Sequence, residues 1–223
     1  MADLELYLSL CGAPAAELCW PVAFLPGPGA CIAFRAIAPT PLMAATTNRV
    51  RIIGGRHRGR WLRFPGVPGL RPTPDRVRET LFNWLGQDLA GRTTLEPYAG
   101  SGAMSLEALS RGATLAVAVD RHPALIQALA DNARLFGAEG LETHRADARA
   151  YLDRETRRFD VIFLDPPFAD DPWDWLLPAC AARLAEGGAI YAEAGRALTP
   201  PPGLEVVRAG RAGQVHYHLL APC

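Results

Sequence analysis

The stretch "FDVIFLDPPFADD", residues 159–171, decides the fold of this 223-residue chain. Its first six residues are apolar except Asp160, a pattern typical of a strand that is buried on both faces. Pro166 and Pro167 then remove two N–H groups from the hydrogen-bonding ladder, so the strand must end near Asp165. A buried strand that ends in a carboxylate, two prolines and an aromatic ring predicts a ligand site at the carboxyl end of a parallel sheet.

Strands and helices alternate on both sides of this stretch. We expect strands near residues 93–97, 114–119, 141–145, 159–164 and 187–193, and helices near 103–111, 123–136, 147–153 and 173–184. This alternation predicts an α/β fold with a Rossmann-like, mostly parallel sheet that is covered by helices on both faces. The last run, residues 203–223, contains two strand-like segments around a glycine turn and predicts a C-terminal antiparallel hairpin.

A further helix is expected at residues 73–86, "TPDRVRETLFNWLG". Thr73 is the expected N-cap and Gly86 the expected stop. Three apolar residues spaced four apart predict a stripe that faces the core: Val77, Leu81 and Leu85.

The positive charge of the chain is concentrated in one segment. Residues 49–78 contain nine arginines and one acid, Asp75, although the formal net charge of the whole chain is zero. Such a cationic segment indicates an RNA or DNA partner. We expect residues 49–72 to form an arginine-rich hairpin arm and residues 73–223 to form the main domain.

Residues 1–48 differ from the rest and are expected to be an N-terminal extension. The first 42 residues contain six prolines, show no hydrophobic period and begin without the basic region of a signal peptide. We interpret them as a disordered segment or a mis-called start, with Met43 as a natural start, and a small structural cap is the alternative. The chain has no apolar run long enough to span a membrane.

The stretch "LEPYAGSGAMS", residues 95–105, predicts a cofactor loop between a strand and a helix. Gly100 and Gly102 allow a tight turn that presents backbone N–H groups to a nucleotide-like ligand. Asp120 follows Gly100 by 20 residues, the spacing of a carboxylate that binds both hydroxyls of an adenosine ribose. Asp147, just after the third strand, is a candidate for the adenine amino group, and a helix N-cap is an equally good interpretation.

The residues Asp165-Pro166-Pro167-Phe168 indicate which chemistry the site performs. The two prolines offer carbonyl oxygens and no N–H, so together with the Asp165 carboxylate they form a group of acceptors without donors. Such a group suits the exocyclic amine of a planar base, and Phe168 offers a face on which that base can stack. A functionless Pro-Pro loop is the alternative, which the upstream glycine loop and Asp120 disfavour.

The sequence offers little evidence for a metal site. The five cysteines have no C-x-x-C spacing, so we interpret them as reduced thiols. His216 and His218 share a strand face and are interpreted as ordinary strand histidines, because no third ligand lies nearby in the sequence.

Three stretches together resemble one known family. The stretches that carry this resemblance are "RIIGGRHRGRWLRFPGVPGLRPTPDRVRETLFNWL", "AGSGAMSLEALSRGA" and "FLDPPF". With them the chain resembles the RsmD family of bacterial small-subunit ribosomal RNA guanine-N2 methyltransferases. The resemblance covers the chain from Arg49 to the C-terminal hairpin. It implies a class I methyltransferase fold and methyl transfer from S-adenosylmethionine to the exocyclic N2 amine of one guanine (the guanine 966 type) in 16S ribosomal RNA.

The resemblance also implies a set of site residues and partners. The residues expected to be catalytic are Asp165, Pro166, Pro167 and Phe168. Those expected to bind the cofactor are Glu96, Ala99, Gly100, Gly102, Asp120 and Asp147. Those expected to bind RNA are Arg51, Arg56, Arg58, Arg60, Arg71 and Arg76. We expect a cytoplasmic monomer, without membrane contact, that acts on 16S ribosomal RNA within a small-subunit assembly particle. No metal is expected.

Two motifs depart from the pattern of the family. The first motif usually begins with aspartate, whereas this chain has Glu96, and the helix that follows usually begins Leu-Gly, whereas this chain has Met104 and Ser105. Glutamate keeps the charge near the ammonium group of the cofactor but has a longer reach.

Three other functions remain as alternatives. A DNA adenine or cytosine amino-methyltransferase needs the same Asp-Pro-Pro-Phe chemistry, and only the arginine-rich region argues against it. A catalytically idle RNA-binding assembly factor is disfavoured by the intact "LDPPF". An NAD-dependent oxidoreductase of the Rossmann type is disfavoured by Ser105, which takes the place of the third glycine of the dinucleotide motif.

Overall fold

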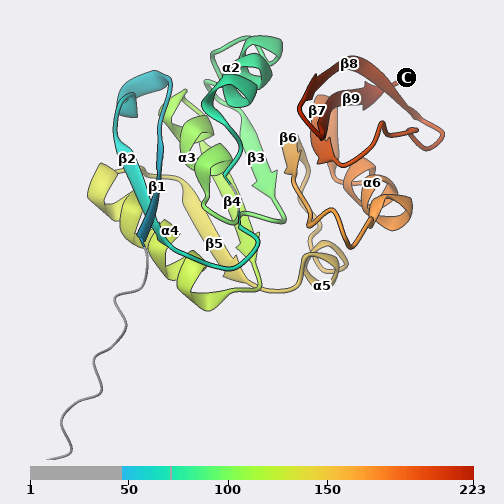
Figure 1. The fold of residues 1–223 in the computed structure, drawn as a ribbon. Coiled ribbons are helices and arrows are strands. Elements are labelled where there is room, and N and C mark those ends of the chain that lie inside the picture. Colours follow the sequence, from blue (N-terminus) through green and yellow to red (C-terminus); the bar gives the residue numbers. More distant parts are fainter. Residues whose placement is uncertain (1–46, 71) are drawn as a thin grey trace, which may run out of the picture. The chain divides into compact units, whose positions relative to one another are not determined.

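The computed structural model of the protein describes residues 47–70 and 72–223 (Figure 1). The expectations for residues 1–42 and for Arg71 therefore lie outside the described residues. No helix in the described part of the chain is both long and apolar enough to cross a membrane.

The centre of the fold is a seven-stranded sheet in the order β5-β4-β3-β6-β7-β9-β8. The pairs β5–β4, β4–β3, β3–β6 and β6–β7 are parallel, whereas β9 runs antiparallel to both β7 and β8. This confirms the predicted α/β fold with a C-terminal antiparallel hairpin. The strands are β3 (Thr93–Glu96), β4 (Leu115–Asp120), β5 (Leu141–Arg145), β6 (Phe159–Leu164), β7 (Leu184–Ala194), β8 (Leu204–Ala212) and β9 (Val215–Pro222).

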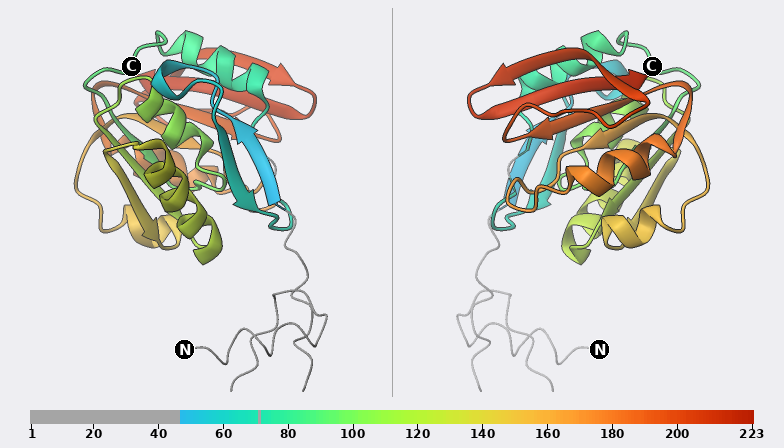
Figure 2. Two further views of the ribbon diagram at one scale, coloured as in Figure 1. Left: turned by 90° about the vertical axis from the view of Figure 1, so that its left-hand side faces the viewer. Right: turned by 90° about the vertical axis from the view of Figure 1, so that its right-hand side faces the viewer.

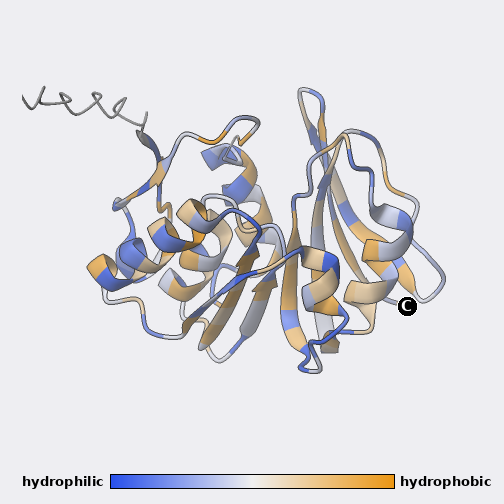
Figure 3. Ribbon diagram, turned by 90° about the horizontal axis from the view of Figure 1, so that it is seen from below, coloured by the Kyte–Doolittle hydropathy of each residue, from blue (hydrophilic) through white to orange (hydrophobic). Residues whose placement is uncertain are grey.

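Helices cover both faces of this sheet (Figures 2 and 3), and their apolar sides turn toward it. They are α2 (Asp75–Trp84), α3 (Ala103–Ser110), α4 (Pro123–Phe136), α5 (Ala148–Leu152) and α6 (Trp173–Ala181). Residues of α2, α3 and α4 belong to one core cluster, and residues of α5 and α6 to the other. The helices therefore divide into two layers with the sheet between them.

Strand β6 explains why the opening stretch is so apolar. Val161 and Phe163 face the cluster of α2, α3 and α4, whereas Ile162 and Leu164 face the cluster of α5 and α6. Phe159 also belongs to the second cluster, because the register of β6 shifts between Phe159 and Val161. Because successive side chains of a strand point to opposite faces, a central strand needs apolar residues at nearly every position. The exception, Asp160, accepts hydrogen bonds from the backbone N and the Oγ1 of Thr93 at 2.7 and 2.9 Å.

The arginine-rich segment forms a separate two-stranded antiparallel sheet of β1 (Thr47–Arg51) and β2 (Trp61–Pro65), linked by the short helix η1 (Gly55–His57). Figure 1 shows this hairpin beside α3 and α4. The side chains of its inner face are buried in the same core cluster as these helices: Val50, Ile52, Leu62 and Phe64. The hairpin is therefore packed against the sheet-bearing body by its apolar face.

A buried ionic network also joins the hairpin to the body. The Glu107 carboxylate, on α3, accepts hydrogen bonds from the backbone N of Ile53 at 2.8 Å and of Gly54 at 2.7 Å. The same carboxylate pairs with Arg78 at 3.3 Å and with Arg111 at 2.9 Å. Arg78 is fully buried, so this member of the nine-arginine segment holds the fold together and does not face solvent.

Two local expectations were wrong. Helix α2 begins at Asp75 with Pro74 as its N-cap residue, and no side chain caps it. Thr73 instead donates its hydroxyl to Glu193, a partner 120 residues away. The helix expected at 173–184 ends at Ala181, because β7 already begins at Leu184 and pairs there with Phe159.

Candidate active site

Two positions of the loop between β3 and α3 have a backbone conformation that strongly favours glycine. Gly100 and Gly102 have φ angles of 51° and 71°, in the left-handed region that other residues rarely adopt. A Cβ atom on Gly102 would lie 2.2 Å from Leu129 Cδ1, and one on Gly100 would lie 2.8 Å from Leu70 Cδ1. The loop therefore turns tightly into the N-terminus of α3, where free N–H groups favour an electron-rich ligand.

The carboxylate of Asp120, at the end of β4, holds this loop in place. Its Oδ2 accepts a hydrogen bond from the backbone N of Gly100 at 2.9 Å, and its Oδ1 accepts one from the backbone N of His122 at 2.7 Å. The structure thus brings Asp120 and the glycine loop together, as the 20-residue spacing suggested. Each oxygen has a second lone-pair direction with which it could accept a hydroxyl of a ribose.

Glu96 ends β3 beneath the same loop and is almost completely buried. Its Oε2 accepts a hydrogen bond from the backbone N of Ser105 at 3.0 Å and another from the Ser105 hydroxyl. Burial raises the pKa of Glu96 to about 8, because the two bonds from Ser105 only partly offset the loss of water. In the cofactor-free protein this carboxyl group is therefore mainly protonated near neutral pH.

Asp147 lies at the N-terminus of α5 and is exposed to solvent. Its Oδ1 accepts hydrogen bonds from the backbone N of Arg149 at 3.0 Å and of Ala150 at 3.2 Å. The alternative interpretation as a helix N-cap is thus present in the structure. The contact with adenine stays a prediction.

The loop Asp165–Phe168 borders two hollows. The inner pocket is lined by residues of the glycine loop and of the strand ends, among them Glu96, Tyr98, Gly100, Asp165 and Tyr191. The outer pocket has a volume of about 300 Å³ and is lined by Pro166, Pro167, Phe168, Asp171, Trp173, Gly195 and Arg196. One short loop therefore has its carboxylate in the pocket of the cofactor loop and its aromatic ring in the neighbouring pocket.

Three acidic side chains meet around the inner pocket. Asp165 is open to solvent at the pocket edge, but its carboxyl is enclosed by the cleft and lies near Glu193 and Glu96. Desolvation, together with the neighbouring carboxyl groups of Glu193 and then Glu96, raises the pKa of Asp165 well above its usual value. These three carboxyl groups therefore suit a ligand that is positively charged or that donates hydrogen bonds.

The sequence interpretation did not include Glu193. This residue of β7 is 3% exposed, and its Oε1 accepts hydrogen bonds from the hydroxyls of Thr73 and Tyr191, both at 2.9 Å. Burial raises its pKa. A charge within the apolar run "AIYAEA", residues 189–194, was the signal that could have revealed it, because buried strands rarely carry an acid without a reason.

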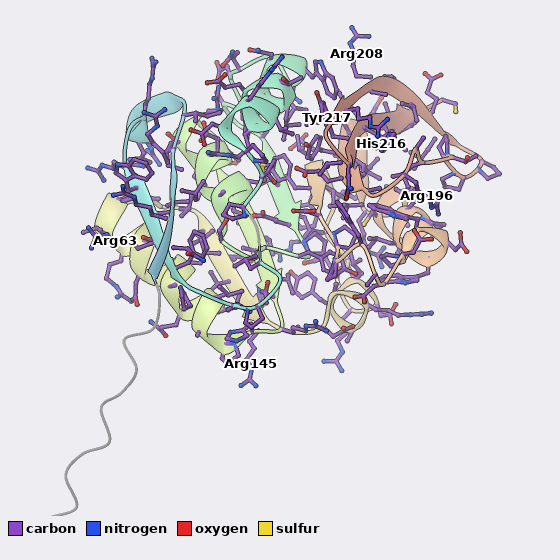
Figure 4. The ribbon with its side chains drawn as sticks, in the orientation of Figure 1. Arg63, Arg145, Arg196, Arg208, His216 and Tyr217 are labelled. Carbon is purple, nitrogen blue, oxygen red and sulfur yellow. The ribbon has the colours of Figure 1, made fainter. Side chains whose placement is uncertain are left out.

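The outer pocket has an exposed aromatic wall and a charged rim. Phe168 is 46% exposed, and Gly195 packs beside its ring, where an added Cβ would lie 3.5 Å from Phe168 Cδ2. Across the rim, Arg196 pairs with Asp171 at 3.2 Å. Figure 4 shows Arg196 in the region of α6. The geometry offers a planar ligand one aromatic face and, at the rim, both donors and acceptors.

The described arginines of the expected RNA-binding set all lie at the surface, and two of them have partners. Arg51 pairs with Asp75 at 3.6 Å, and the Arg60 guanidinium donates to the backbone O of Phe136 at 3.1 Å. Arg56, Arg58 and Arg76 are exposed, and within the described residues no hydrogen bond or ion pair occupies their guanidinium groups.

His216 and His218 lie side by side on β9 with stacked rings, 6.5 Å between centroids. His218 is buried, and its Nε2 accepts a hydrogen bond from the backbone N of Leu198 at 3.3 Å. Figure 4 shows His216 close to Tyr217 on the same strand. Within residues 47–70 and 72–223, no group of three or more His, Cys, Asp or Glu side chains is arranged so that it could hold a metal ion.

Comparisons with known proteins agree with this geometry. The family model described as "Conserved hypothetical protein 95" matches residues 50–221. The ribosomal RNA small subunit methyltransferase D of Escherichia coli (strain K12) is 38% identical over 178 residues, which cover 78% of this chain and 90% of that protein.

Solved structures with the same fold are also similar in sequence. The structure of yhhF from Escherichia coli has a TM-score of 0.71 and 38% identity, and the match covers 78% of this chain and 98% of that one. The structure of a hypothetical protein from Thermus thermophilus, TTHA0928, has a TM-score of 0.64 and 32% identity, with coverage of 76% and 98%.

Proposed function

This chain belongs to the family described as Conserved hypothetical protein 95, and from that premise we propose that it methylates the exocyclic N2 amine of a guanine in 16S ribosomal RNA. Its curated relatives are named as ribosomal RNA small subunit methyltransferases, so the chain is an S-adenosylmethionine-dependent ribosomal RNA methyltransferase. The chemical group and the base on which it acts are inferred from the site.

The observation that carries this proposal is the position of the loop Asp165–Phe168 between the two pockets. A methyl donor above the glycine loop would lie on the Asp165 side, and a base stacked on Phe168 would lie on the other side. The amine of that base would then meet the Asp165 carboxylate and the Pro166 carbonyl at the loop that borders both pockets. Proline at both positions keeps N–H donors away from an amine that must itself donate.

The residues of the inner pocket fit S-adenosylmethionine. Gly100 lines the pocket at a positive φ, Asp120 accepts a hydrogen bond from Gly100 and would also accept ribose hydroxyls, and Glu96 and Asp165 supply carboxyl groups that can ionise beside a cationic ligand. Ala99 also lines this pocket, as expected for the cofactor set. When bound, the cofactor supplies a methyl group attached to a sulfonium. The leaving group is then a neutral thioether, so its departure needs no general acid.

The role of Asp165 is to orient the amine and to receive its proton. Two acceptors that hold the hydrogens of an exocyclic amine direct its lone pair toward the methyl carbon, and this orientation lowers the entropic part of the barrier. After transfer the nitrogen carries an extra proton. The positive charge of the bound cofactor favours the ionised form of Asp165, and the raised pKa of this carboxyl group makes that form a stronger proton acceptor.

The target base must leave its stack to reach Phe168. Extrusion of a nucleotide costs a few kcal/mol, and stacking on an aromatic side chain returns ~1–3 kcal/mol of this. The volume of the outer pocket, about 300 Å³, lies at the lower end of the range for small-molecule sites and suits one base. The positive surface of the hairpin, with Arg56 and Arg58, would hold the phosphates nearby.

A methyl-transfer assay tests this function. The protein is incubated with tritiated S-adenosylmethionine and, in parallel, with naked 16S ribosomal RNA, small-subunit assembly particles, mature small subunits and double-stranded DNA. We expect label in RNA only, and mass mapping of nuclease fragments should place it on the N2 atom of one guanine. Label in DNA on adenine or cytosine amines would favour a DNA amino-methyltransferase, and no label in any substrate would favour an idle assembly factor.

A further inference from the structure

One exposed aromatic residue lies outside the site described above. Among the described residues, three large hydrophobic side chains are exposed: Trp61 at 44%, Leu135 at 73% and Phe168 at 46%. Phe168 belongs to the outer pocket. Trp61 lies at the start of β2, on the arginine-rich hairpin, and no part of the catalytic site accounts for its exposure.

The outer face of the hairpin combines this ring with arginines. In the β1–β2 register Arg51 stands opposite Trp61 and Arg49 opposite Arg63, so these four side chains share one face. They alternate with the buried inner residues Val50, Ile52, Leu62 and Phe64. The guanidinium carbon of Arg49 lies 4.5 Å from the centre of the Trp61 ring. Figure 4 shows Arg63 on the hairpin at the edge of the molecule.

This arrangement does not favour folding by itself. Like charges directly opposite on an antiparallel pair are destabilising, and Arg49 faces Arg63. A tryptophan that stays almost half exposed gives up part of the stabilisation that its burial would provide. Arg51 has a partial counterion in Asp75, but within the described residues no carboxylate pairs with Arg49 or Arg63. A ligand that brings both an anion and an aromatic face would compensate for both features.

We propose that Trp61 is a second base-binding site, on which an unpaired nucleotide of the RNA substrate stacks while Arg49 and Arg63 contact its flanking phosphates. This inference rests on the proposed function, because it takes RNA as the substrate. Arg49 contacts the indole ring by a cation–π interaction, and the 44% of Trp61 that remains exposed would offer surface to a base. The site anchors RNA away from Phe168 and takes no part in methyl transfer.

Single-stranded RNA is the ligand that this chemistry selects. A duplex hides the faces of its bases, whereas an unpaired nucleotide exposes them to aromatic side chains. Stacking is nearly independent of base identity and of salt, and phosphate contacts depend strongly on salt. The two contributions can therefore be separated in one experiment.

The experiment measures dissociation constants at several salt concentrations with two probes, 16S ribosomal RNA and single-stranded oligoadenylate. The proteins are wild type, Trp61→Ala, Trp61→Phe and Arg49→Ala, with Leu135→Ala as the control for loss of an exposed apolar side chain. We expect Trp61→Ala to weaken binding roughly 5- to 150-fold, which corresponds to ~1–3 kcal/mol for one stacked base. The slope of log Kd against log salt should stay unchanged, and Trp61→Phe should restore most of the affinity.

Further readouts separate anchoring from catalysis and from a structural role. Trp61→Ala should raise KM for ribosomal RNA while kcat at saturating RNA, S-adenosylmethionine affinity and thermal stability stay close to wild type. Arg49→Ala should instead flatten the salt slope. An unchanged Kd in Trp61→Ala, or a weakened Kd that phenylalanine does not restore, would overturn the inference while wild-type methylation of RNA leaves the proposed function intact. If wild type neither binds nor methylates RNA, both fail together.

Discussion

Glu96 and Ser105 are hydrogen-bonded to each other beneath the cofactor loop, and one carboxylate oxygen accepts from both the backbone N and the hydroxyl of the serine. These are two of the positions at which the chain departs from the pattern of the RsmD family. Glutamate is longer than aspartate by one methylene group, and a serine hydroxyl gives its carboxylate a partner that glycine cannot supply. The two departures therefore form one interaction.

The protonation of Glu96 predicts that cofactor binding releases a proton. Its pKa of about 8 in the free protein is raised from 4.5, so the group is mainly neutral at pH 7. A cationic ligand stabilises the carboxylate, so the pKa falls on binding and the proton leaves. Affinity for S-adenosylmethionine should accordingly rise with pH up to about 8 and then level off.

Calorimetry in two buffers of different ionisation enthalpy measures this proton release. Glu96→Gln, which cannot ionise, should show no release from this position and a flatter pH dependence. Ser105→Gly removes a bond that lowers the pKa of Glu96, so it should move the rise in affinity to higher pH. Equal proton release in wild type and Glu96→Gln would show that Glu96 is not the titrating group.

Replacement of Asp120 by asparagine should weaken S-adenosylmethionine binding at least tenfold. The carboxylate accepts from two backbone N–H groups, and an amide would turn an NH2 group toward one of them. Titration calorimetry gives the affinity, and circular dichroism should show that the fold is retained. Asp131→Asn, a change of the same kind at an exposed position on α4, is the control and should bind as wild type.

Asp165→Asn should lower the rate of methyl transfer more than tenfold, a loss of at least ~1.4 kcal/mol in transition-state stabilisation. The amide can still accept a hydrogen bond through its oxygen, but it cannot receive the proton of the amine. S-adenosylmethionine affinity should stay within a few-fold of wild type. Single-turnover assays give the rate. The control is Asp170→Asn, the same change at an exposed residue of the neighbouring loop. A wild-type rate in Asp165→Asn would remove this residue from the chemistry.

Arg56 and Arg58 should contribute to RNA affinity through phosphate contacts. Both are exposed and without partners in the described part of the chain, whereas Arg60 is engaged with Phe136. Each contact with single-stranded RNA contributes a slope of roughly −0.7 to log K against log salt. The double variant Arg56→Ala/Arg58→Ala should therefore flatten the slope by up to about 1.4 and leave S-adenosylmethionine binding unchanged. Parallel slopes for variant and wild type would exclude phosphate contacts at these positions.

The fold could be predicted from the sequence because its signals are local. The apolar run of β6, the stop at Pro166 and the positive-φ glycines each depend on residues within a few positions of one another. The same holds for the cofactor loop and Asp120, whose spacing reflects one strand–helix–strand unit.

The missed features depend instead on contacts between distant segments. Thr73 resembles an N-cap because a proline and an acid follow it, but its hydroxyl donates a hydrogen bond to Glu193, which lies 120 residues later in the sequence. No local pattern reports such a pair. The role of Arg78 was hidden for the same reason, because its buried partner Glu107 lies 29 residues away.

The basic segment contains both buried and exposed arginines, and Arg78 and Arg76 are an example of each. They lie two residues apart on α2, so one side chain is fully buried and the other is exposed. Arg78 donates to Glu107, to Asp75 at 2.6 Å and to the backbone O of Arg51 at 2.7 Å. Its loss would leave the buried Glu107 carboxylate with Arg111 as its one remaining cationic partner in the described part of the chain.

Arg78→Ala should therefore lower the free energy of unfolding by about 3–5 kcal/mol, the usual cost when one partner of a buried ion pair is removed. The loss should appear first at the hairpin, because Glu107 also holds the backbone N–H groups of Ile53 and Gly54. Amide hydrogen exchange should show these two residues losing protection before β6 does. Arg76→Ala is the matched control, for which we expect wild-type stability together with a weaker, less salt-dependent affinity for RNA. If both variants unfold at the denaturant concentration of wild type, the network does not hold the hairpin, and its position must depend on the apolar face of β1 and β2 alone.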